Sequence, residues 1–107
     1  MVRWLTAIDD ERMTLKFEFY KGMAFVHSSF KETLAGMRAA REIYPQVKAW
    51  LKRMGHDWVY VIIPRGDEKR YRCVRSFGFS EVEPTVAPRE LSRGLISKNQ
   101  ILLGQEC

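Results

Sequence analysis

Cysteine is scarce in this chain, and long apolar runs are absent. Cys73 and Cys107 are the only two cysteines among 107 residues, too few and too far apart to suggest a disulfide framework or a zinc site. No apolar stretch approaches the length of a membrane span, and the N-terminus lacks the apolar core of a signal peptide. We therefore expect a protein without a membrane span, in the cytoplasm of the cell that makes it.

Several enzyme motifs are missing as well. The sequence has no P-loop, no nucleophile elbow and no spacing of ligand residues that is typical of a metal site. Glu18 and Glu32 do not form a carboxylate pair of defined spacing. The sequence therefore predicts no metal ion, and no motif identifies a catalytic group.

The residues that are present indicate one folded domain. Apolar residues make up 46% of the chain and aromatic residues 12%, which favours a packed core over disorder. The formal net charge of +5 is compatible with an acidic partner, but a soluble basic surface with no partner is the more ordinary explanation.

The first half predicts strands and one long helix. Residues 2–8 alternate in hydrophobicity, and residues 14–28 alternate around a Lys-Gly step, which is typical of a β-hairpin. Between residues 33 and 54, apolar residues recur at three- and four-residue steps and predict one face of an amphipathic helix. Pro45 removes an amide donor inside this pattern, so the helix either kinks there or divides into two.

The second half begins with an apolar run at 57–63, which predicts a strand covered on both faces. A turn follows, and Asp67 is placed to cap a short helix. In that helix Tyr71 has the spacing of a core-facing residue, and Gly78 lies where a helix usually ends. Residues 79–83 predict another short strand.

Residues 84–107 have a different character. Two prolines open the segment, and its later apolar residues show no convincing period. We predict a domain over residues 1–83 and an extended arm over residues 84–107, with one short strand or helix at most. The expected fold class is α/β (α+β): a single, mostly antiparallel sheet with a long and a short helix packed on it.

The strand at 58–63, Tyr71 with Val74, and the step from Ser76 to Phe79 follow a familiar order. Over about residues 14–83 the chain resembles the C-terminal half of the GNAT (GCN5-related N-acetyltransferase) fold. The resemblance implies acetyl-CoA as the cofactor. Its diphosphate would be held by backbone amides between the hairpin and the long helix, on an Arg/Gln-x-x-Gly-x-Gly/Ala loop.

The matching stretch here, residues 28–37, departs from that loop. It has one glycine and neither Arg nor Gln at the expected position, and Glu32 brings a negative charge toward the diphosphate. If acetyl-CoA binds, the candidate cofactor-binding residues are Phe30, Lys31, Glu32 and Thr33. The family's N-terminal strand and helices, which usually build the acceptor side, have little room in the first 13 residues.

The basic helix at 34–53, the strand from Trp58 to Val61 and the segment from Arg75 to Phe79 carry a closer resemblance. They are similar to the small GNAT-like internal virion or virion-assembly proteins of short-tailed phages. This resemblance implies a non-catalytic, degenerate GNAT-like component of a phage particle. Such a protein would contact portal, tail or internal virion proteins and be incorporated in the virion.

Three functions stay open at this point. A structural or assembly component would be supported by an exposed patch containing Trp4, Trp50 or Phe30. An acetyl-CoA-dependent N-acetyltransferase would need a nest of backbone amides around residues 30–33. A basic nucleic-acid-binding protein would show an affinity that depends on salt.

A few side chains are candidates for these functions. His27, at a strand end, is a candidate general base, and by resemblance Tyr71 is a candidate general acid. The ordinary alternatives are a surface or hydrogen-bonded histidine and a core tyrosine. A solvated helix face is likewise the ordinary alternative for the cations that could meet nucleic acid or an acidic protein, which are Arg65, Lys69, Arg70, Arg72 and Arg75.

Overall fold

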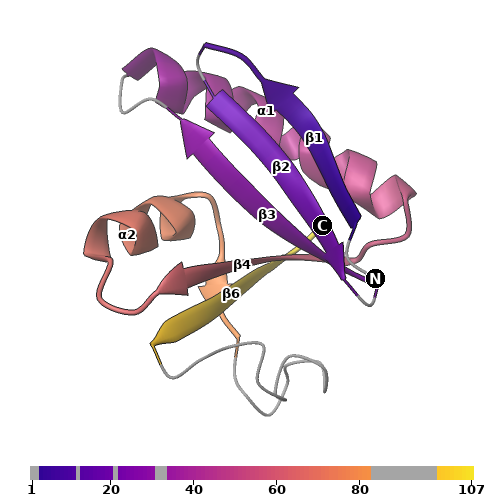
Figure 1. The fold of residues 1–107 in the computed structure, drawn as a ribbon. Helices are drawn as coiled ribbons and strands as arrows, with labels where there is room; N and C mark the ends of the chain where they lie inside the picture. The colour runs from indigo at the N-terminus through magenta and orange to yellow at the C-terminus, as the bar shows by residue number, and fades with distance from the viewer. Residues whose placement is uncertain (1–2, 12, 21, 31–33, 83–98) are drawn as a thin grey trace. The chain divides into compact units, whose positions relative to one another are not determined.

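The computed structural model describes residues 3–11, 13–20, 22–30, 34–82 and 99–107. It contains six strands in a mostly antiparallel sheet and two helices (Figure 1), which confirms the mixed α/β class. The chain divides into two compact units, Met1–Val59 with Glu106–Cys107, and Tyr60–Gln105. Neither helix in the described ranges combines the length and the apolar character that a membrane crossing requires.

The sheet of the first unit is built from three antiparallel strands, β1 (Arg3–Asp9), β2 (Met13–Tyr20) and β3 (Met23–Phe30). β2 and β3 pair along their whole length, which confirms the predicted hairpin. Gly22 lies between them with a φ of 78°, a conformation that glycine adopts without steric cost. A register shift interrupts the pairing of β1 with β2 between Thr6 and Ile8.

Helix α1 (Leu34–Arg53) lies across one face of these strands (Figure 1). Leu51 on the helix and Phe17 on β2 are both fully buried. The ring centroids of Phe17 and Trp50 are 5.9 Å apart. The alternation of β2 and the helical period of α1 therefore direct their apolar sides toward each other.

Pro45 lies inside α1 without dividing it. The alternative of two helices meeting at this proline is therefore wrong. Proline in a helix interior costs about 3 kcal/mol or more because one backbone hydrogen bond is lost. Ala40 before it and Val47 and Leu51 after it are all buried, so tertiary packing stabilises both halves as one helix.

The chain passes into the second unit within β4. This unit holds most of β4 (Trp58–Pro64) and of β6 (Gln100–Glu106), together with α2 (Glu68–Ser76) and β5 (Ser80–Glu81), and the strand order is β4-β6-β5. Asp67 caps α2, since its side chain accepts a hydrogen bond from the Arg70 amide at 3.1 Å. Gly78 follows the helix with a φ of 98°. The predicted cap and the predicted stop are both confirmed.

Two burial predictions need correction. Val59 and Ile63 of β4 are buried, but Trp58 is 45% exposed, so the strand is not covered on both faces throughout. No residue of α2 is buried, and Tyr71 is only half-buried. The core-packing interpretation of Tyr71 is therefore wrong, because this short, highly charged helix presents little apolar surface to the sheet.

Strand β6 is the short strand for which the prediction over residues 84–107 allowed. It pairs antiparallel with β5, and its residue Leu103 is fully buried. β5 itself is shorter than the strand predicted at 79–83, since it contains only Ser80 and Glu81. Leu102, beside Leu103 in β6, is also buried. A strand covered on both faces shows no alternation, which is why its sequence lacked a period. Residues 83–98 lie outside the described residues.

The end of the chain is also held in place. The Cys107 amide donates a hydrogen bond to the Asp57 carbonyl at 2.8 Å, and the residue is partly buried rather than loose. Burial is the main cause that raises the pKa of the Cys107 thiol, while Lys48 lowers it.

We expect Leu103→Ala to lower the free energy of unfolding by about 3 kcal/mol, because it removes buried methyl groups and leaves a cavity. Ile101→Ala, in the same strand but at a half-buried position, should cost clearly less. Urea unfolding of both variants measures the difference. Equal, small effects would show that β6 behaves as an arm rather than as a core strand.

Candidate functional site

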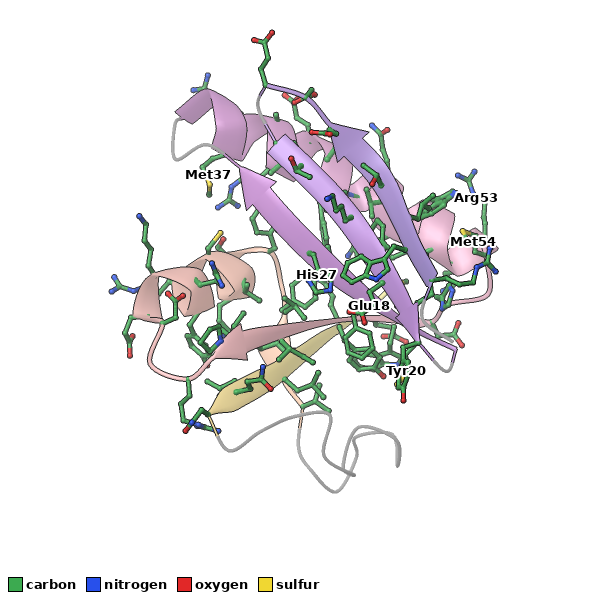
Figure 2. All side chains as sticks on the ribbon, in the orientation of Figure 1. Glu18, Tyr20, His27, Met37, Arg53 and Met54 are labelled. Carbon is green, nitrogen blue, oxygen red and sulfur yellow. The ribbon has the colours of Figure 1, made fainter. Side chains whose placement is uncertain are left out.

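Three side chains from neighbouring strands of the first unit form one cluster. The Nε2 atom of His27 on β3 lies 3.0 Å from the Oε1 atom of Glu18 on β2, and Figure 2 shows the two side chains facing each other. The Trp4 ring on β1 lies 4.9 Å from the His27 ring, centroid to centroid, at an angle of 42°. We call these residues the Trp4–Glu18–His27 cluster.

The strand register explains why these residues meet. Trp4 is directly opposite Glu18, and His27 is opposite Lys16, two residues along the same strand. Positions two apart on a strand share a face, so all three side chains lie on one side of the sheet. Phe17 points to the other side, where Trp50 of α1 contacts it.

The cluster is accessible to solvent. The His27 and Glu18 side chains are 50% and 28% exposed, and Trp4 is 58% exposed. When Nε2 carries the proton and donates to Glu18, Nδ1 has a lone pair that can accept a proton. The pair therefore has the composition of an orienting carboxylate and a general base.

Tyr71 and Glu81 form a second pair, within the second unit. The Tyr71 hydroxyl donates a hydrogen bond to Oε2 of Glu81 at 3.0 Å. This bond is the main cause that raises the pKa of Tyr71 above its ordinary value, while Arg75 acts in the opposite direction. Tyr71 therefore keeps its proton at neutral pH, but that proton is directed at Glu81.

The five candidate partner-binding cations all lie in the second unit and are all exposed. Arg70 lies 3.6 Å from Asp67, and Arg75 donates to the Phe79 carbonyl at 3.2 Å. We call the group the α2 cations, which are Arg65, Lys69, Arg70, Arg72 and Arg75.

The predicted cofactor loop is described only at its borders. Phe30 is the last residue of β3, paired with Met13, whereas residues 31–33 lie outside the described residues. α1 has no acidic residue in its first turn, and Gly36 is buried there. The described part thus neither supplies nor blocks a diphosphate site, and acetyl-CoA stays a prediction.

The described residues contain no group of three or more His, Cys, Asp and Glu side chains that could hold a metal ion.

Sequence reasoning named His27 and Tyr71 but missed their partners. The Glu18 pairing had a usable signal, because a hairpin turning at residues 21–22 places residue 18 diagonally opposite residue 27. Trp4 and Glu81 had no such signal. Trp4 meets His27 through the pairing of strands, and Glu81 meets Tyr71 through the packing of the second unit. Local periodicity encodes neither contact.

Comparisons with known proteins support the architecture. No family model matches the chain, and no curated protein sequence matches it. Among solved structures, it is similar to a ribosomal-protein-S5-alanine acetyltransferase from Vibrio fischeri, with a TM-score of 0.57 at 12% identity. The match covers 89% of this chain and 54% of that one, so this chain spans about half the length of that enzyme.

A second similar structure is a protein proposed to be an acetyltransferase, from Agrobacterium tumefaciens. It gives a TM-score of 0.55 at 16% identity, over 99% of this chain and 76% of the other. The fold is GNAT-like. At these identities the GNAT-like neighbours establish the architecture alone, and what this GNAT-like chain does must come from its own residues.

Removing the Glu81 carboxylate should lower the pKa of Tyr71 toward its ordinary value of 10.0, because the main cause of the shift is lost. Absorbance titration at 295 nm of Glu81→Gln, with Tyr71→Phe as the reference spectrum, measures this. Glu68→Gln should move the pKa less, since Glu68 is the smallest cause of the shift. An unchanged Tyr71 titration in Glu81→Gln would contradict the hydrogen bond.

The same shift has a consequence for stability. A tyrosine whose pKa is higher in the folded state loses its proton first in the unfolded state. The contribution of the Tyr71–Glu81 bond is therefore present below pH 10 and is lost as the pH rises beyond it.

Proposed function

We propose that this GNAT-like chain acts through protein–protein contacts made by β1 rather than through acetyl transfer. The observation that carries the proposal is the exposure of large apolar side chains on this strand. Trp4 is 58% exposed and Leu5 is 38% exposed. Because they are neighbours on the strand, Trp4 and Leu5 lie on opposite faces of the sheet, Trp4 with Glu18 and Leu5 with Phe17. An exposed tryptophan such as Trp4 is typical of the anchor residue of a protein interface.

The position of β1 supports the same conclusion. It is the last strand at one end of the sheet, so among the described residues no strand pairs with one side of its backbone. Six of its seven residues are exposed. Such an edge can pair with a strand of a partner, while alternate side chains such as Trp4 provide specificity.

The patch differs from the one considered from the sequence. Trp4 is exposed as required, but Trp50 is half-buried against Phe17. The side chain of Phe30 lies outside the described residues. The proposed contact surface is therefore β1, with Trp4 as its anchor residue.

The setting we propose is the assembly of a phage particle, with a portal, tail or internal virion protein as the partner. This part rests on the sequence resemblance of residues 34–53, 58–61 and 75–79 alone. A role without catalysis is supported by the loop at 28–37, which has one glycine and an acidic residue at Glu32. Glycines let a backbone approach a diphosphate, and a carboxylate nearby repels it.

An N-acetyltransferase is the second candidate, and the Glu18–His27 pair favours it. In that role His27 would accept a proton from the attacking amine while Glu18 holds the ring in the required orientation. Acetyl-CoA would supply the acetyl group.

Calorimetry with acetyl-CoA distinguishes the two functions. We expect no binding at millimolar cofactor, because the loop has one glycine where a diphosphate site uses several and carries the acidic Glu32. Micromolar binding that Lys31→Glu weakens would overturn the non-catalytic proposal. If His27→Gln then abolished acetylation of an amine while keeping that binding, the enzyme would be established.

Site-specific photo-crosslinking in the producing cell tests the proposed surface. A photoreactive residue in place of Trp4 should give an adduct with one protein of the purified particle. The matched control is the same residue at Trp58, which is also exposed, at 45%, but lies in β4. Adducts of the same yield from both positions, or none from Trp4, would contradict a contact surface on β1.

A further inference from the structure

We propose that α2 and the turn before it form a surface for the phosphate backbone of nucleic acid. Residues 65–75 contain the five α2 cations and two carboxylates, a net charge of +3, whereas the whole chain carries +5. More than half of the net charge is thus concentrated in eleven residues. This surface is separate from β1, and the inference does not depend on the proposed function.

Asp67, one of the two carboxylates in this segment, leaves Arg70 largely exposed. Asp67 is already used, because one of its oxygens accepts the Arg70 amide as the helix cap. Its other oxygen lies 3.6 Å from the Arg70 guanidinium, whose side chain stays 62% exposed. Exposed ion pairs of this kind are weak, so a phosphate could replace the carboxylate at Arg70.

Lys69 and Arg72 are the central residues of the surface. They are three positions apart on α2, which places them on the same side of the helix one turn apart. Both are exposed. Arg65 is exposed in the turn before the helix, so three cations follow one another along this part of the chain.

The helix that carries them is fixed within the second unit. The Gln105 side-chain amide donates to the Phe77 carbonyl at 3.0 Å at the end of α2. The Tyr71 hydroxyl is bonded to Glu81 of β5 at 3.0 Å. Cations on an anchored helix lose less conformational freedom when they bind a regular array of phosphates than cations on a loose segment would.

The composition favours nucleic acid over an acidic protein. Four of the five cations are arginines, whose planar guanidinium matches phosphate geometry. Protein interfaces usually need an apolar anchor at their centre and have few charges there. The large exposed apolar residues of the described chain are Trp4, Leu5, Met54 and Trp58, and none lies in this segment. Protein–nucleic acid interfaces are the more positively charged class.

Fluorescence anisotropy with a labelled 20-base-pair DNA duplex tests the inference. With about three phosphates neutralised, the wild-type affinity should fall about 40-fold between 50 and 200 mM salt. The double variant Lys69→Gln/Arg72→Gln should bind more weakly at 50 mM and lose only about 4-fold over the same range, since one phosphate contact remains.

The matched control is Arg38→Gln/Arg41→Gln, with the same charge change and spacing on exposed positions of α1. This control and Trp4→Ser should keep the wild-type salt dependence. Absence of wild-type binding at 50 mM salt, or equal losses in the two double variants, would overturn the assignment to α2. Competition by a poly-glutamate peptide as effective as unlabelled duplex would overturn it in favour of an acidic protein. Thermal unfolding of each variant checks that it is folded.

Discussion

The burial of Phe17 beneath α1 is the contact on which the first unit depends. Phe17 has no exposed surface, and its ring meets Trp50 of the helix. Because side chains alternate on a strand, placing Phe17 inside forces its neighbour Glu18 to the opposite face. The Trp4–Glu18–His27 cluster is therefore a consequence of core packing on the other side of the same sheet. Moving β2 by one residue would bury Glu18 and expose Phe17.

The second unit follows a different logic, because α2 has no buried residue. Its position comes from polar contacts: the Asp67 cap, the Tyr71–Glu81 bond and the Gln105 bond to Phe77. Because these contacts involve the two ends of α2 and the Tyr71 hydroxyl, the solvent-facing side of the helix can carry charged residues. This is why so many cations can be carried in so few residues, and why Tyr71 is turned toward Glu81.

This GNAT-like fold therefore carries groups with different chemistry. β1 exposes Trp4 beside the Glu18–His27 pair, which can exchange protons, and the α2 cations carry positive charge. The fold by itself does not choose among them, since one architecture serves many functions. The choice rests on particular residues, above all on the exposed Trp4 and on the single glycine of the loop at 28–37.

Local chemistry in the sequence determined the hairpin, the long helix, the Asp67 cap and the stop at Gly78. Each follows from side-chain period or from backbone preference over a few residues. Only the tertiary structure decided that α1 continues through Pro45 and that residues 100–106 are a core strand. It alone also brought Trp4 to His27 and Tyr71 to Glu81. These outcomes depend on contacts between residues that are distant in the chain. At Pro45 the free energy of packing outweighs the local preference, and in the other cases the local sequence contains no signal of the contact.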